Sequence, residues 1–242
     1  MKTNVVWLSG GKDSTAMALR LAELDPDTDW RYVCTPTGDE LPDVLLHWAK
    51  LEILLGKSIE KVRHKLTLNE MIAEFNALPS WRMRWCTRML KIDTAKAWYK
   101  KNAPCVAYVG LRADEPEREG GIFGGEIEQR YPMREWGWGL AEVWRYLMER
   151  GVQIPQRTDC ARCPYQRLGD WWELWKEHPS YYASAEAQED AVGHTFRSDQ
   201  RDTWPADLKG LRLRFERGDV PRGVDLNGDL FGRREVCRAC SL

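Results

Sequence analysis

The stretch Asn4-Val5-Val6-Trp7-Leu8-Ser9-Gly10-Gly11-Lys12-Asp13-Ser14 decides the fold of this chain. Residues 4–8 are typical of a short buried strand, and the glycine pair lets the backbone turn tightly where that strand ends. The residues from about Ser14 to Leu24 predict a helix that stops before Asp25-Pro26. The N–H groups of the turn and the positive end of the helix would face one point, which suits a phosphate.

The side chains of this turn favour the same interpretation. Lys12 adds a cation, Ser9 and Ser14 add hydroxyl donors, and Asp13 makes sense if a divalent cation shares the phosphates. The alternative is a glycine turn that only precedes a helix cap. Two rival phosphate motifs do not match, because this turn is neither Gly-x-x-x-x-Gly-Lys-[Ser/Thr] nor Gly-x-Gly-x-x-Gly.

Beyond the turn, predicted strands alternate with predicted helices. The strands are expected at residues 31–35, 59–62 and 105–111, and the helices at 44–55, 66–75 and 140–147. Such alternation implies a parallel sheet with helices on both faces, with the binding site at the carboxyl ends of the strands. Residues 158–242 are instead rich in Trp, Arg and Cys without a convincing strand. We therefore expect a phosphate-binding domain at 1–155 and a mainly helical, cysteine-containing subdomain at 156–242.

Composition indicates an ordinary globular protein. Of the 242 residues, 43% are hydrophobic and 30% charged, and the net charge is −1. Contact with a polyanion would therefore have to be local. No apolar run approaches the roughly 20 residues of a membrane helix, and the start, residues 1–4, leads into a strand rather than a signal peptide. We expect a cytoplasmic protein with no membrane segment.

Four of the seven cysteines form two Cys-x-x-Cys pairs, Cys160/Cys163 and Cys237/Cys240. Four thiolates are enough for a tetrahedral Zn²⁺ or an iron–sulfur cluster. The alternative is two unrelated free pairs. Cys34 and Cys105 lie in apolar strand-like runs and are interpreted as buried small hydrophobic residues.

Arg112 follows the predicted strand that ends near residue 111, at the same sheet edge as the glycine turn. A guanidinium there can bind phosphate or sulfate with two hydrogen bonds. The alternative is a surface arginine paired with Asp114 or Glu115.

Together these segments resemble a known superfamily. Ser9–Ser14 resembles the PP-loop of the adenine-nucleotide alpha-hydrolases, and the later segments are similar to their phosphoadenosine phosphosulfate (PAPS) reductase branch. The later segments are Thr37-Gly38-Asp39-Glu40-Leu41-Pro42, Gly110-Leu111-Arg112-Ala113-Asp114-Glu115 with Arg118, Tyr131–Trp136 and Val143–Tyr146. The resemblance implies a HUP-type, Rossmann-like sheet that binds ATP, adenosine phosphosulfate (APS) or PAPS, with Mg²⁺. The implied nucleotide-binding residues are Ser9, Gly10, Gly11, Lys12, Asp13, Ser14, Thr37, Gly38, Arg112 and Arg118.

The resemblance extends to the cysteines. Cys86-Thr87-Arg88-Met89-Leu90-Lys91 resembles the first cysteine element of the iron–sulfur members of the branch, and Cys160-Ala161-Arg162-Cys163 resembles the second. This implies a [4Fe–4S] cluster rather than Zn²⁺. Thr87 stands where the family has a second cysteine, so either one iron stays open or Cys237 or Cys240 supplies a ligand. The implied ligands are therefore Cys86, Cys160, Cys163, Cys237 and Cys240.

The implied reaction is ATP-dependent adenylation of a substrate followed by sulfur transfer, with Lys12, Asp13, Arg112 and Cys86 as the catalytic residues. The alternative is reduction of APS or PAPS to sulfite, although the chain ends without the Glu-Cys-Gly-[Ile/Leu]-His motif of thioredoxin-dependent reductases. These reactions would need a sulfur donor or a thiol reductant as partner. A third alternative is a non-enzymatic protein whose binding depends on nucleotide and metal.

Two basic runs point to further partners. Arg82, Arg84, Arg88 and Lys91 surround Cys86 and either line the approach of an anionic substrate or form a solvated face. The run Arg212, Arg214, Arg217 and Arg222 weakly indicates a nucleic-acid partner.

Overall fold

The computed structural model describes residues 2–120, 124–199 and 201–224. Its centre is a parallel sheet of five strands in the order β3-β2-β1-β4-β5. The strands are β1 (Thr3–Trp7), β2 (Trp30–Cys34), β3 (Ile59–Lys61), β4 (Cys105–Tyr108) and β5 (Ile127–Arg130). From β1 the chain adds β2 and β3 on one side of the sheet, and it then returns to add β4 and β5 on the other side of β1. A crevice is expected at the carboxyl ends of β1 and β4, where this change of side occurs.

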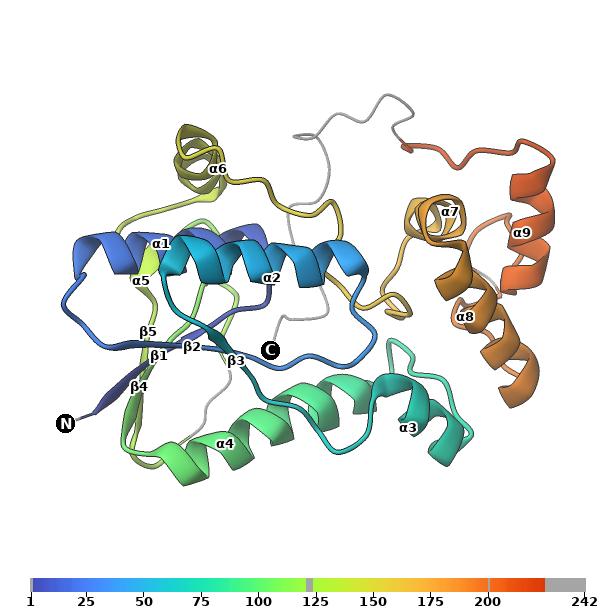
Figure 1. Ribbon diagram of the computed structural model, residues 1–242. Coiled ribbons are helices and arrows are strands. Elements are labelled where there is room, and N and C mark those ends of the chain that lie inside the picture. The colour runs from blue at the N-terminus through green and yellow to red at the C-terminus, as the bar shows by residue number, and fades with distance from the viewer. Residues whose placement is uncertain (1, 121–123, 200, 225–242) are drawn as a thin grey trace.

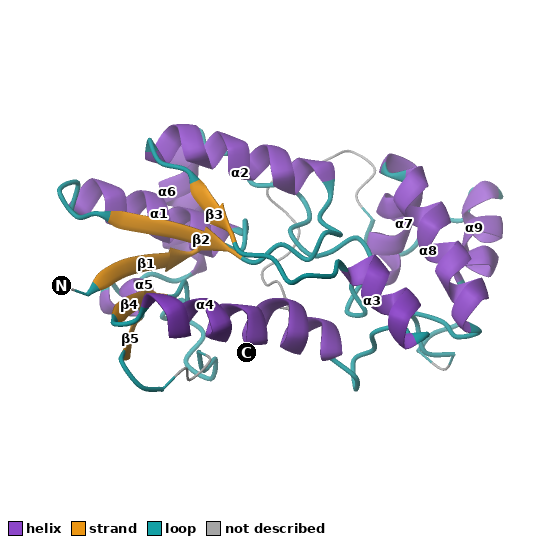
Figure 2. Cartoon of the chain, turned by 60° about the horizontal axis from the view of Figure 1, so that its bottom comes forward, coloured by secondary structure: helices purple, strands orange, loops and turns teal. Residues whose placement is uncertain are grey.

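Helices cover both faces of this sheet, as the sequence predicts. The helices of the described residues are α1 (Lys12–Leu24), α2 (Pro42–Leu55), α3 (Leu68–Phe75), η1 (Thr87–Asp93, a π-helix), α4 (Thr94–Asn102), α5 (Pro132–Glu135), α6 (Leu140–Glu149), α7 (Leu168–Glu177), α8 (Pro179–Val192) and α9 (Leu208–Glu216). In Figures 1 and 2, α1, α2 and α6 lie on one face of the sheet and α4 lies on the other. The predicted α/β fold is therefore confirmed.

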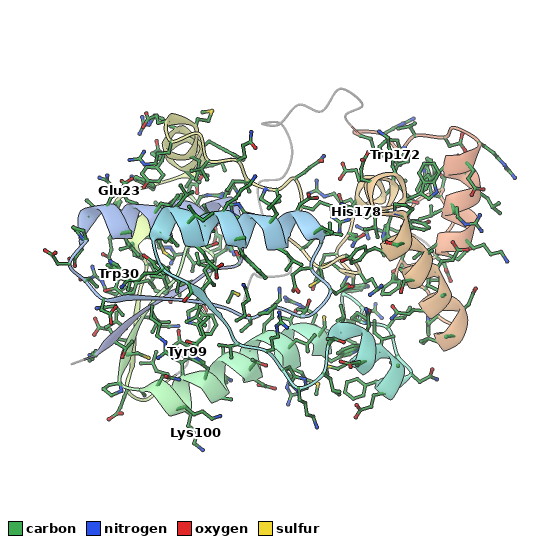
Figure 3. The ribbon with its side chains drawn as sticks, viewed as in Figure 1. Glu23, Trp30, Tyr99, Lys100, Trp172 and His178 are labelled. Atoms are coloured by element: carbon green, nitrogen blue, oxygen red, sulfur yellow. The ribbon has the colours of Figure 1, made fainter. Side chains whose placement is uncertain are left out.

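Side chains that alternate along the strands build two apolar clusters, as expected for a sheet covered on both faces. Val6 belongs to the cluster under α1 and α2, whereas its neighbour Val5 packs with α4. Trp30 and Tyr99, both labelled in Figure 3, belong to these two clusters respectively. Cys34 and Cys105 are both buried, as predicted for small hydrophobic residues.

Local signals explain where the predicted helices begin and end. Proline stands at the start of α2, and Gly56 closes that helix in the left-handed region at φ 63°. Thr67 and Glu70 form a reciprocal capping box at the start of α3. Before residue 155, the elements β5, η1, α4 and α5 were not among the sequence predictions. The predicted strand 105–111 ends earlier, at Tyr108.

The end of the molecule farthest from the sheet is formed by α7, α8 and α9 (Figure 1). Trp171 on α7 packs against Tyr182 on α8 and exposes only 1% of its surface. The described residues beyond 155 form helices and one isolated bridge, Glu40 with Cys160, but no strand. Trp171 and Leu8 belong to one continuous apolar cluster. In the described parts of the chain, no helix is both long and apolar enough to cross a membrane.

Candidate functional site

The glycine turn joins β1 to α1 in the way its sequence predicts. Gly10 has φ 84°, a left-handed conformation that favours glycine, and a Cβ at this position would lie 2.8 Å from Trp48 Nε1. Gly11 is extended and precedes the first helical residue, Lys12. The backbone can therefore turn here only because residue 10 has no side chain.

The two serines of the turn hold it closed. Their hydroxyl oxygens lie 3.1 Å apart, and Ser14 Oγ accepts a hydrogen bond from the Ser9 backbone N–H at 3.2 Å. Ser9 Oγ accepts from the Gly11 N–H at 3.3 Å, and the Ser14 hydroxyl donates to the Gly11 carbonyl at 3.2 Å. Both hydroxyls thus shape the loop from within.

Three charged side chains meet beside the turn. Lys12 Nζ lies 3.4 Å from an Asp13 carboxylate oxygen, and Arg112 Nη1 lies 3.4 Å from the same oxygen. Burial lowers the pKa of Lys12, an effect that Asp13 partly offsets. Burial also raises the pKa of Asp13, against the opposing effect of Lys12 and Arg112. The structure therefore brings the three predicted catalytic residues Lys12, Asp13 and Arg112 together.

Arg112 is buried rather than on the surface, with 4% of its surface exposed. Its guanidinium also binds Asp114 at 2.8 Å and Glu115 at 3.1 Å, so the ion pairs of the alternative interpretation exist but stand inside the site. Gly110 explains the approach, because a Cβ there would lie 3.2 Å from the backbone nitrogen of Ser14. The loop after β4 thus passes directly over the first turn of α1.

The remainder of the arginine loop is tied to later segments. Arg118 binds Glu115 at 2.7 Å, and Glu115 also binds Arg112, the arginine that contacts Asp13. Arg134 donates to the Glu115 carbonyl at 2.9 Å and also to the carbonyl of Arg118. The second oxygen of Asp114 accepts from the N–H of Leu140 at 2.9 Å, at the start of α6.

The Thr37-Gly38 turn is folded by the carboxylate of Glu40. One oxygen of Glu40 accepts from the Thr37 N–H at 2.6 Å and from its hydroxyl at 2.7 Å, and the other accepts from the Gly38 N–H at 3.0 Å. Gly38 has φ 80°, and a Cβ there would meet the Thr67 side chain. The turn follows β2, so it stands at the same sheet edge as the glycine turn.

The first Cys-x-x-Cys loop is bound to this Thr37-Gly38 turn. Asp39 accepts from the backbone N–H of Arg162 at 2.9 Å and from its guanidinium at 2.5 Å, and both side chains are almost completely buried. The Asp39 carbonyl accepts from the Ala161 N–H at 2.8 Å. Cys160 Sγ lies 3.2 Å from Thr37 Oγ1. The predicted nucleotide residue Thr37 and the predicted metal ligand Cys160 are therefore in direct contact.

Three thiols lie within the electrostatic reach of one ammonium group. Burial raises the pKa of Cys86, Cys160 and Cys163, that of Cys160 to about 12, and Lys91 opposes the effect at each of them. Cys86 is half-buried and immediately precedes η1. The positive charge of Lys91 thus opposes the rise in pKa at thiols from two segments that are distant in sequence.

The metal centre itself stays a prediction. Within the described ranges, no group of three or more Cys, His, Asp or Glu side chains stands at a spacing that could hold a metal ion. The predicted ligands Cys237 and Cys240 lie outside the described residues.

Other residues at this edge were not predicted as site residues. Thr158 Oγ1 lies 3.6 Å from where a Gly11 Cβ would be, so the segment before Cys160 passes beside the glycine turn. Asp39, Glu40 and Arg162 stand inside motifs that the sequence singled out, but their structural roles were not foreseen. The available signal for the contact between these motifs was the opposite charge of Asp39 and Arg162.

Two of the four arginines in the second basic run, Arg212 and Arg214, form ion pairs within the protein. Arg212 binds Glu186 at 2.9 Å and Glu216 at 3.0 Å. Arg214 binds Asp219 at 2.8 Å and stacks over the Trp204 ring at 3.8 Å. These two arginines stabilise the surroundings of α9, whereas Arg217 and Arg222 are exposed. Nucleic-acid contact at this run stays a prediction.

Comparison with known proteins supports the fold and the family. The structure is similar to a PAPS reductase from Candida auris, with a TM-score of 0.52, 16% identity, and coverage of 64% of this chain and 76% of that one. It is also similar to the U34-tRNA thiolase NcsA from Methanococcus maripaludis, described with its [4Fe–4S] cluster. There the TM-score is 0.50 and the identity 18%, over 100% of this chain and 80% of that one.

At these identities the likeness shows the fold alone. No curated protein matches the sequence. The model of the phosphoadenosine phosphosulfate reductase domain matches residues 3–174, well over half of the chain. With the glycine turn, the arginine loop and the Thr37-Gly38 turn assembled at one sheet edge, the chain belongs to the phosphoadenosine phosphosulfate reductase domain family.

Proposed function

We propose that this protein is an adenine-nucleotide-dependent enzyme that uses ATP to adenylate a substrate and then transfers sulfur to it at a cysteine-bound centre. One observation carries the proposal: the Cys-x-x-Cys loop is bound through Asp39 and Thr37 to the turn after β2, and Thr158 stands beside the glycine turn after β1. The glycine turn and the Cys-x-x-Cys loop thus stand at one edge of the sheet. An enzyme that couples nucleotide cleavage to sulfur chemistry needs this proximity.

The nucleotide would bind with its phosphates at the start of α1. The Gly10-Gly11 turn leads the backbone directly into the first turn of α1, and the helix adds its positive end there. The ammonium of Lys12 and the guanidinium of Arg112 would exchange Asp13 for phosphate oxygens, and Asp13 would then be available to a Mg²⁺ ion. The mutual ion pairs keep these buried charges compensated before the nucleotide arrives.

The reaction would proceed in two displacements. A substrate oxygen attacks the α-phosphorus of ATP, and pyrophosphate leaves with the electron pair of the broken P–O bond. A nucleophilic sulfur then attacks the activated carbon, and AMP leaves with the substrate oxygen. Lys12 and Arg112 would stabilise the negative charge that develops on the phosphates in the first step.

Cys86, Cys160 and Cys163 would be the donors of a soft-metal centre, because thiolate sulfur is the kind of ligand that such metals prefer. Lys91 opposes the burial that raises the pKa of each thiol, which favours the thiolate form. Among the described residues, three ligands do not stand at coordinating distances. A complete metal centre would therefore need movement of the Cys86 segment or a ligand from Cys237 or Cys240. A [4Fe–4S] cluster would supply an iron that can hold sulfide. A tetrahedral Zn²⁺ is the alternative for the same donors.

The test is release of pyrophosphate from ATP together with nucleotide-induced stabilisation. ATP should raise the melting temperature of the wild type, and Lys12→Ala/Asp13→Ala should abolish the rise while the free protein still folds. The matched control is Lys57→Ala/Asp29→Ala, which removes an exposed Lys–Asp pair of 2.7 Å. An undiminished shift in the first variant would refute the nucleotide site. Sulfite release from APS or PAPS, without pyrophosphate release from ATP, would establish the reductase alternative.

A further inference from the structure

A short turn between α3 and η1 holds aromatic and apolar side chains in solvent. Trp81 and Met83 expose 56% and 57% of their surfaces, and Arg82 between them is also exposed. Ser80 closes the turn, because its hydroxyl oxygen accepts from the Met83 N–H at 3.0 Å and its own N–H donates to the Met83 carbonyl at 3.2 Å. The exposed side chains are therefore presented by a fixed backbone, which lowers the entropy lost on binding.

The same segment has a strong local charge. Residues 75–92 contain Arg82, Arg84, Arg88 and Lys91 but no acidic residue, in a chain whose net charge is −1. The Arg82 guanidinium stacks over the Trp81 ring, 4.6 Å from its centroid. The Arg88 side chain is 78% exposed and lies 3.6 Å from Asp93. Solvent screens an ion pair this exposed, so Asp93 binds Arg88 only weakly. Positive charge and an exposed aromatic ring thus occur together.

This surface adjoins the Cys-x-x-Cys loop. The Tyr165 hydroxyl donates to the Trp81 carbonyl at 3.5 Å, and the Arg84 guanidinium lies 5.2 Å from the centroid of the Tyr165 ring. Tyr165 follows Cys163 by only two residues. We call this surface the Trp81 patch, and it comprises Trp81, Arg82, Met83, Arg84, Arg88 and Tyr165.

We propose that the Trp81 patch binds single-stranded nucleic acid and leads it to the neighbouring thiols, so that a nucleic-acid strand is the substrate of the proposed enzyme. This inference rests on the proposed function. An unpaired base can stack on an exposed indole, and arginines at the same turn can bind the phosphates on either side of it. A paired base offers no free face for such stacking. The near-neutral chain requires a local patch for polyanion binding, and residues 75–92 provide one.

The test measures binding of the full-length protein to labelled, unstructured oligonucleotides of about 12 residues, as RNA and as DNA, by fluorescence anisotropy. Trp81→Ala should weaken binding about 5- to 150-fold, the loss expected for one stacked base, and Trp81→Phe should retain most of the affinity. Arg82→Gln should make the slope of log K against log salt shallower by about 0.7. The matched control is Lys100→Gln/Lys101→Gln, on α4, where Lys100 is labelled in Figure 3. It should bind like the wild type.

A preference for RNA or for DNA identifies the strand, and either result supports the proposal. Three results would overturn it. The first is a dissociation constant above about 100 µM for the wild type, and the second is wild-type affinity in Trp81→Ala. The third is equal competition by heparin in the wild type and Trp81→Ala, which indicates only general attraction of polyanions. Melting temperatures of the variants exclude misfolding, since Trp81 and Arg82 are exposed. Strand binding without pyrophosphate release from ATP would refute the proposed function alone, whereas pyrophosphate release without strand binding would refute the patch alone.

Discussion

Replacing Asp39 by asparagine should strongly destabilise the contact between the Thr37-Gly38 turn and the Cys-x-x-Cys loop. Asp39 exposes 1% and Arg162 2% of their surfaces, and the carboxylate takes two hydrogen bonds from that arginine. Asparagine keeps the shape but leaves the guanidinium buried without its counter-charge. Loss of one partner of a buried pair costs about 3–5 kcal/mol. Asp39→Asn/Arg162→Met removes both charges and should recover part of that loss.

Two measurements check this expectation. Urea unfolding gives the free energy of unfolding, with an unchanged m-value as evidence that both states keep their compactness. Labelling of Cys163, which exposes 5% of its surface, reports local opening of the loop. If the free energy of local opening of the loop falls by about 3 kcal/mol, Cys163 should be labelled about 150-fold faster.

The control is Glu23→Gln, which breaks the exposed pair of Glu23 and Arg150 at 2.6 Å and should cost less than about 1 kcal/mol. If Asp39→Asn loses no more stability than this control and Cys163 is labelled at the wild-type rate, the pair does not hold the loop.

Three further variants test other parts of the site. Gly10→Ala places a Cβ 2.8 Å from Trp48 Nε1 on a backbone with left-handed φ. Urea unfolding should show that the free energy of unfolding falls by about 2 kcal/mol or more. A fall of less than about 0.5 kcal/mol would contradict the geometry. Burial lowers the pKa of His47 to about 4, so the unfolded chain takes up a proton before the folded protein does as the pH falls. The contribution of His47 to the free energy of unfolding is fully present above pH 6.5 and should decline towards pH 4, by up to about 3 kcal/mol. His47→Gln should flatten the profile of unfolding free energy against pH. Cys86→Ser should lower the iron content of anaerobically reconstituted protein while the ATP-induced rise in melting temperature persists; unchanged iron would make Cys86 an ordinary packing residue.

The fold was predictable where its signals are local. The strand, the glycine pair and the helix from Lys12 are contiguous, so the first unit is encoded within about twenty residues. In contrast, β5 has the sequence Ile-Glu-Gln-Arg with an alternating half-exposed pattern and becomes a strand only by pairing with β4. The helix α4 has a weak apolar pattern, and it buries Trp98 and Tyr99 against a sheet face that forms from other strands.

The site was predictable to the extent that it follows strand ends. Parallel strands bring Thr37 and Arg112 to the edge where the glycine turn lies, because each follows a strand of the same sheet. The docking of the Cys-x-x-Cys loop could not be foreseen, since Asp39 and Arg162 are more than a hundred residues apart and their pairing depends on tertiary structure. Nothing in a Cys-x-x-Cys spacing indicates which loop it will contact.

The carboxylate of Asp114 binds two groups at once, so events at Arg112 should be measurable at the start of α6. One carboxylate oxygen holds the Arg112 guanidinium, and the other accepts the N–H of Leu140 where α6 begins. A ligand that draws Arg112 towards its phosphates removes a counter-charge from Asp114 and alters the strength of the helix cap. The rate of amide hydrogen exchange at Leu140 should therefore change on nucleotide binding. The paired indoles of Trp136 and Trp138, 5.2 Å apart just before that helix, should follow the same event in their fluorescence.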